Sequence, residues 1–93
     1  MLPVVWTAQA EDDLLKIVQF IGERNLFAAQ SLGNALKEST WPLSEHPMLF
    51  KRSARVIGCR EIVVHPNYIV LYVVQETKIL VVNVVHASRN FPS

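Results

Sequence analysis

The strongest constraint on the fold is a series of β-branched and aromatic segments in the last third of the chain. Segments 60–64 and 68–74 are rich in valine, isoleucine, leucine and tyrosine, and the turn-forming Pro66 lies between them. A second polar turn at 75–78 leads into a third apolar segment, 79–85. Three consecutive strands joined by short turns predict an antiparallel sheet. Since both faces of 68–74 are apolar, each face of the sheet needs at least partial cover.

The first half of the chain predicts two helices that supply this cover. Thr7 and Asn25 are good N-cap residues for the first and second helix, and Pro42 should end or kink the second. Apolar residues recur at helical spacing after each cap: Ala10, Leu14, Ile17, Val18 and Ile21, then Ala28, Ala29, Leu32, Ala35 and Leu36. Residues 2–6 predict a short strand, which Pro3 assigns to a sheet edge.

The segment that connects the helices to the sheet is basic and contains no acid between residues 46 and 60. Phe50–Ile57 predicts an outer strand, after which Gly58 turns the chain into the central hairpin. The expected fold is therefore α+β in the order β-α-α-β-β-β, with an N-terminal helical hairpin packed on a twisted antiparallel sheet. At 93 residues the chain has the size of a single domain, 1–93.

The net charge of +1 conceals an asymmetry between the two halves of the chain. Residues 1–45 carry six acids and three bases, hence −3, whereas residues 46–93 carry six bases and two acids, hence +4. A basic sheet half suits nucleic acid or an acidic peptide as partner. The lone Cys59 excludes an internal disulfide, and no zinc-ligand spacing is present, so a reducing cytoplasm, no metal and no cofactor are expected. The polar residues that interrupt the apolar stretches argue against a membrane span.

In their order and spacing, several residues resemble the RelE/ParE superfamily of toxins from type II toxin–antitoxin pairs. They extend over nearly the whole chain: Trp6, Ala10, Asp13, Leu14, Asn25, Ala28, Ala29, Leu43, Pro47, Gly58, Arg60, Tyr68, Tyr72, His86 and Arg89. The resemblance implies the fold predicted above and a cytoplasmic bacterial protein. It also implies a cognate antitoxin as partner, in a toxin–antitoxin hetero-oligomer.

The resemblance implies two alternative mechanisms. RelE-like members cut messenger RNA on the ribosome, whereas ParE-like members inhibit DNA gyrase and need no catalytic centre for it. RNA cleavage requires a base, an acid and positive charge beside the phosphate. For that alternative the candidate catalytic residues are His86 and Arg60, expected to converge on the exposed sheet face, with Glu45 or His46 as a second proton-transfer group.

The basic residues also have a simpler interpretation as a binding surface for antitoxin or nucleic acid. This set comprises Lys51, Arg52, Arg55, Arg60 and Arg89. Phe91 stands where the RNA-cutting members carry an aromatic hydroxyl near the C-terminus, and phenylalanine cannot transfer a proton. The ParE-like mechanism is therefore favoured, with an inactive antitoxin-binding module as a further alternative.

Four other residues have structural interpretations. Tyr68 and Tyr72 share one strand face and predict core packing, and Asn83 interrupts an apolar strand and predicts a structural hydrogen bond. His65 reads as a turn residue before Pro66. Cys59 reads as a small inert side chain.

Overall fold

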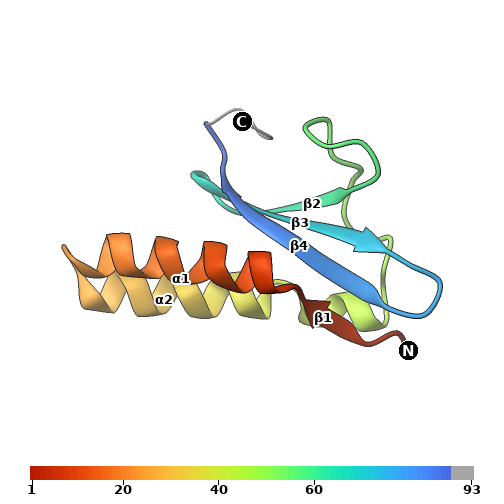
Figure 1. Cartoon of the computed structure of the whole chain (residues 1–93), viewed down its shortest axis with the longest axis horizontal. Coiled ribbons are helices and arrows are strands. Elements are labelled where there is room, and N and C mark those ends of the chain that lie inside the picture. The colour runs from red at the N-terminus through yellow and green to blue at the C-terminus, as the bar shows by residue number, and fades with distance from the viewer. Residues whose placement is uncertain (89–93) are drawn as a thin grey trace.

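The structure is a computed structural model, and it describes residues 1–88. The predicted order of elements is confirmed (Figure 1). The elements are β1 (Val4–Trp6), α1 (Ala8–Gly22), α2 (Leu26–Glu38), the 3-10 helix η1 (Trp41–Ser44), β2 (Arg60–His65), β3 (Tyr68–Val74) and β4 (Ile79–His86). The two helices form an antiparallel hairpin on one side of the sheet, and the far end of this hairpin projects past the strands (Figure 1).

Both predicted helix caps are present. The Thr7 hydroxyl accepts a hydrogen bond from the Ala10 N–H at 3.1 Å, and the Asn25 side chain accepts one from the Ala28 N–H at 2.9 Å. Each cap satisfies a backbone donor that the first turn of a helix leaves free. The second helix ends before Pro42, which lies in η1.

The sheet has the strand order β1-β4-β3-β2, and its pairing corrects one expectation. β2, β3 and β4 are antiparallel as predicted, but β1 runs parallel to β4, so the sheet is mixed. In the sequence, the helical hairpin separates β1 from the three antiparallel strands β2, β3 and β4. A connection of this length allows β1 to pair parallel to β4. β1 is an edge strand, as Pro3 predicts, and the Pro3 carbonyl accepts a hydrogen bond from the Ile79 N–H at 2.9 Å.

The outer strand expected at Phe50–Ile57 is wrong. Only an isolated bridge between Arg52 and Arg60 forms there. The Ser53 hydroxyl accepts hydrogen bonds from the main-chain N–H groups of Arg55 and Val56, at 3.0 and 3.3 Å, and so turns the backbone away from a ladder. Gly58 then reverses the chain with a φ of 90°, which is in the left-handed region.

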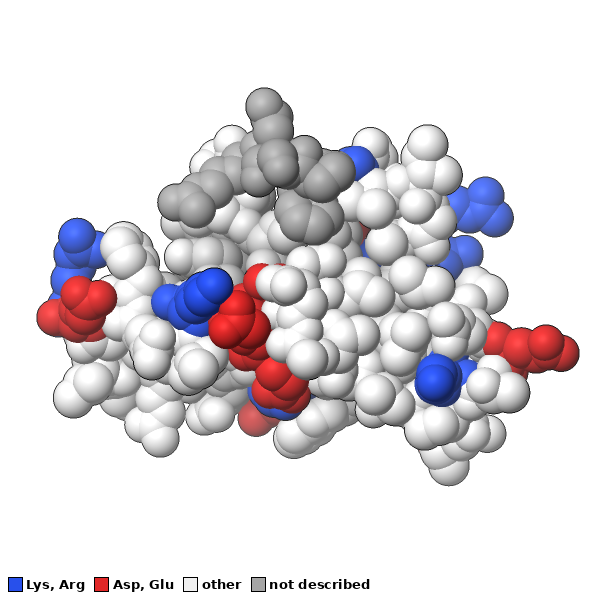
Figure 2. All heavy atoms as spheres, in the orientation of Figure 1, with Lys and Arg blue, Asp and Glu red and all other residues white. Residues whose placement is uncertain are grey.

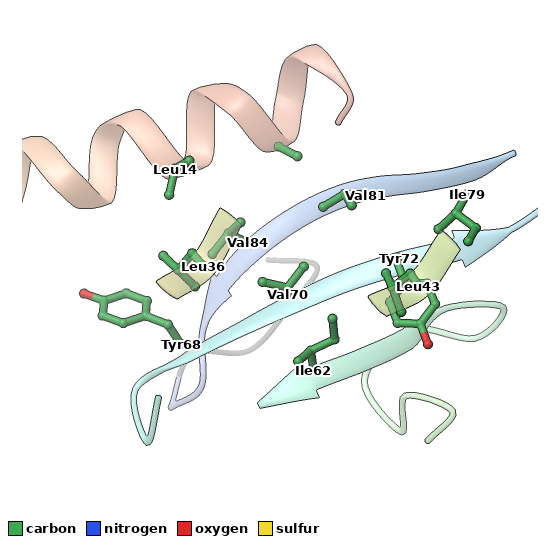
Figure 3. Packing of buried hydrophobic residues seen from close by; sticks show 11 residues of the cluster. Leu14, Leu36, Leu43, Ile62, Tyr68, Val70, Tyr72, Ile79, Val81 and Val84 are labelled. Carbon is green, nitrogen blue, oxygen red and sulfur yellow. The ribbon is translucent and has the colours of Figure 1, made fainter. Parts of the chain in front are cut away.

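The main core lies between the helical hairpin and the sheet (Figure 3). Tyr68, Val70 and Tyr72 of β3 face this core, which confirms the structural interpretation of both tyrosines. The opposite sheet face carries a smaller cluster of Ile69, Leu71 and Val85. Neither helix within residues 1–88 reaches the length and hydropathy that crossing a membrane requires.

Candidate functional site

Arg60 begins β2 on the sheet face that is turned toward the core. It is paired with Tyr72 of β3, and directly opposed residues in an antiparallel pair share a face. One of its guanidinium nitrogens, Nη1, donates a hydrogen bond to the Phe50 carbonyl at 2.7 Å. This bond orients the side chain, which is half-buried, toward the loop before β2.

Arg52 lies directly across the isolated bridge from Arg60. Both arginines line a hollow of about 410 Å³, whose wall also includes Met48, Ile57 and Val74. Neither guanidinium forms an ion pair with a carboxylate of residues 1–88. Two cations therefore share one hollow, which we call the arginine hollow.

The other predicted basic residues do not join the arginine hollow. Lys51 points to the opposite sheet face, where its Nζ lies 3.9 Å from a carboxylate oxygen of the buried Glu61. Arg55 is half-buried in the turn that follows Ser53. Arg89 lies outside the described residues, as does Phe91. On the face shown in Figure 2, Lys and Arg gather over the side where Figure 1 places the loop before β2.

His86 ends β4 at the other end of the sheet. It pairs with Tyr68, and the two rings meet edge-on with their centroids 5.2 Å apart. The Ser88 N–H donates to the imidazole Nδ1 at 3.3 Å, and the Ser88 hydroxyl lies 2.8 Å from the same nitrogen. His86 also lines a hollow of about 470 Å³ together with Lys16 and Phe20 of α1.

The structure does not bring His86 and Arg60 together, contrary to the expectation. Their partners on β3, Tyr68 and Tyr72, are four residues apart, which is about 13 Å along a strand. Both residues also lie on the face that packs against the helices and not on the exposed face. Glu45 is exposed just beyond η1. A base and a phosphate-binding cation for one reaction would need to be within reach of the same substrate atoms.

Asp13 of α1, one of the residues of the family resemblance, has a structural role that the sequence analysis did not predict. Its Oδ2 accepts two hydrogen bonds of 3.0 Å, from the Asn83 side-chain amide and from the Val84 N–H. The predicted structural hydrogen bond of Asn83 is therefore confirmed. The sequence signal that could have predicted this role is the position of an acid directly before Leu14, a buried residue of α1.

Burial perturbs two titratable groups near the arginine hollow. Desolvation raises the pKa of the Tyr72 hydroxyl, which donates a hydrogen bond to the Pro47 carbonyl at 2.9 Å, while nearby Arg60 acts in the opposite direction. Desolvation also raises the pKa of the Cys59 thiol, which lies in the wall of the hollow. A raised pKa keeps the thiol protonated and a poor nucleophile, in agreement with its interpretation as inert.

Comparisons with known proteins agree with this fold. The chain is 35% identical over 89 residues to Toxin RelE2 of Caulobacter vibrioides, covering 96% of this chain and 99% of that protein. A structure of the chromosomal ParDE toxin–antitoxin system of P. aeruginosa superimposes with a TM-score of 0.82 at 19% identity, covering 92% of this chain and 96% of the other. The E. coli DinJ-YafQ toxin–antitoxin complex superimposes with a TM-score of 0.63 at 15% identity, with 97% of each chain covered.

The family assignment rests on a match that extends over most of the chain. Residues 4–91 match the family described as the ParE toxin of the type II toxin-antitoxin system parDE. Together with the identity to Toxin RelE2, this match shows that the chain is a type II toxin and belongs to the ParE toxin family.

Proposed function

We propose that this ParE-family toxin acts by binding and inhibiting DNA gyrase, without a catalytic centre of its own. The observation that carries the proposal is the separation of His86 from Arg60, whose partners Tyr68 and Tyr72 are four residues apart on β3. General acid–base catalysis requires its groups within hydrogen-bonding reach of one substrate. A toxin that acts by binding has no such requirement. Gyrase works on DNA in the cytoplasm, so the proposal also assigns the protein to that compartment.

The proposal includes a cognate antitoxin that binds the toxin and keeps it inactive. Two structures with this fold, the ParDE system and the DinJ-YafQ complex, come from toxin–antitoxin systems. Residues 46–59, the acid-free part of the loop between η1 and β2, offer positive charge beside exposed apolar side chains. Such a surface suits an acidic protein partner.

A second candidate function is ribosome-dependent cleavage of messenger RNA. It is favoured by the relative named Toxin RelE2, and by the two arginines that share one hollow and can hold a phosphate. Under this alternative Arg60 would bind the phosphate, and His86 would need to approach it through a change of conformation.

One pair of assays on the purified toxin separates the candidates. The first follows supercoiling of a plasmid by gyrase, and the second follows cleavage of a message on translating ribosomes. We expect inhibited supercoiling with an intact message. A cut message with normal supercoiling would overturn the gyrase proposal in favour of the nuclease, whereas inactivity in both assays would identify an inactive antitoxin-binding module.

A further inference from the structure

The arginine hollow is surrounded by large apolar side chains that water reaches. Met48 and Ile57 line the hollow and are 61% and fully exposed, and Leu49, which follows Met48 in the chain, is 55% exposed. All three lie in the same loop as Arg52, between η1 and β2. Exposed apolar side chains that surround arginines have the composition of the core of a protein–protein interface.

The charges of the arginine hollow are uncompensated within residues 1–88. Like charges directly opposite each other in a β-pairing destabilise it, and Arg52 and Arg60 are opposite each other in the isolated bridge. A guanidinium carries five N–H donors, and the Phe50 carbonyl occupies one nitrogen of Arg60. The remaining donors can hold a carboxylate in a bidentate arrangement.

We propose that the arginine hollow binds an acidic, apolar segment of the antitoxin. One carboxylate of the segment lies between Arg52 and Arg60, and a neighbouring apolar side chain covers Met48 and Ile57. This inference rests on the proposed function, because it takes the antitoxin of that proposal as the occupant.

The residues in and around the arginine hollow favour a protein over a nucleic acid as its occupant. A nucleic-acid backbone binds along a track of several cations. Here the next cation in the sequence, Lys51, lies on the opposite sheet face beside Glu61. A phosphate backbone would also gain nothing from the exposed Ile57, whereas an apolar side chain of a protein would bury it.

The test measures binding of the full-length toxin to the protein encoded beside its gene, by isothermal titration calorimetry. Arg52→Glu places an acid in the hollow without touching the bond between Arg60 and Phe50, and we expect affinity to fall by at least about tenfold. Ile57→Ser should lower affinity by about threefold or more through lost apolar burial. Arg24→Glu, a matched charge reversal at the far end of the helical hairpin, serves as control and should change affinity less than about threefold.

A charge exchange strengthens the test. If the carboxylate that meets Arg52 is replaced by arginine in the partner, the Arg52→Glu toxin should regain most of its affinity. Arg52→Gln guards against misfolding, because it removes the charge without adding an acid. The thermal unfolding and the far-ultraviolet ellipticity of each variant establish that it is folded.

The outcomes separate the inference from the function on which it rests. Unchanged affinity of a folded Arg52→Glu toxin, with the wild type still bound, would overturn the inference and leave the antitoxin proposal intact. No binding of the wild type would overturn both. The inference would also be overturned if the wild-type toxin bound a single-stranded RNA or DNA oligonucleotide and Arg52→Glu did not, while antitoxin affinity stayed unchanged. The arginine hollow would then be a nucleic-acid site.

Discussion

The Asp13 carboxylate of α1 accepts a hydrogen bond from the Val84 main-chain N–H of β4, with 3.0 Å between nitrogen and oxygen. β1 pairs with β4 only from Ile79 to Val81, so the rest of β4 lacks a neighbouring strand on that side. The start of α1 takes its place, because the Thr7 N–H donates to the Val81 carbonyl and Asp13 then binds Val84. The carboxylate of Asp13 thus provides a hydrogen-bond acceptor for the edge of β4 beyond the last residue that pairs with β1.

This geometry predicts that Asp13 contributes to stability far more than its acidic neighbour. Asp13→Ala leaves the Val84 N–H and the Asn83 amide without their acceptor, and we expect a loss of about 2–3 kcal/mol in the free energy of unfolding. Asp12→Ala is the matched control, since Asp12 forms an exposed ion pair with Lys16 whose loss should cost less than about 0.5 kcal/mol. Urea denaturation of both variants measures the difference. Equal losses would contradict the role of Asp13.

Tyr72→Phe tests the hydrogen bond that ties β3 to the loop before β2. The hydroxyl is buried and donates to the Pro47 carbonyl, so its removal should lower the free energy of unfolding by about 1–2 kcal/mol at neutral pH. The variant should keep its helix content, because the ring still fills the core. Denaturant titration monitored by tryptophan fluorescence gives the value, and an unchanged midpoint would show that the bond contributes nothing.

Alkaline pH should destabilise the protein partly through the same residue. Burial raises the pKa of Tyr72 in the folded state, so above pH of about 10 the unfolded chain loses this proton first. The contribution of the protonated Tyr72 hydroxyl to the free energy of unfolding is complete below that pH. It is lost as the pH rises through the folded-state pKa. We expect stability between about pH 9 and 11 to fall less steeply in Tyr72→Phe than in the wild type. Parallel slopes in thermal melts over this range would contradict the expectation.

Two glycine substitutions should have opposite effects. Gly58 has a φ of 90°, so Gly58→Ala should cost about 1–2 kcal/mol from backbone strain, although within residues 1–88 the added Cβ has no neighbour within 4 Å outside the adjacent residues. Gly22→Ala lies at the end of α1, where the added Cβ meets the Ala29 Cβ at an ordinary 3.6 Å, so it should be neutral or stabilise by up to about 1 kcal/mol. Melting temperatures of the two variants provide the test. A stable Gly58→Ala protein would mean that the turn relaxes without strain.

His86→Ala distinguishes the binding mechanism from the catalytic one in cells. Under the gyrase proposal the variant should still arrest growth, because the imidazole is not required for chemistry. Ser88→Ala is a useful control, since it removes the hydroxyl beside Nδ1 and leaves the ring in place. Colony counts after induction, with toxin levels checked by immunoblot, measure the effect. Abolished toxicity in a folded His86→Ala protein, with Ser88→Ala still toxic, would shift the interpretation to RNA cleavage.

The sequence by itself determined the elements of this fold and most of their boundaries. Helix caps such as Thr7 and Asn25, and turn residues such as Pro66 and Gly58, act on backbone groups a few residues away. Their effects can therefore be read from local spacing. The failure of the expected outer strand was also a local effect, because the Ser53 hydroxyl competed with a strand ladder.

Only the tertiary structure decided how these elements form a site. The parallel pairing of β1 with β4, and the bond between Asp13 and Val84, join residues about seventy positions apart, and no local pattern specifies such a pair. Strand register likewise decided that His86 faces Tyr68 and that Arg60 faces Tyr72, which separates the two predicted catalytic residues. Register depends on how all four strands bury their apolar faces together, so it is a property of the whole sheet and not of any one strand.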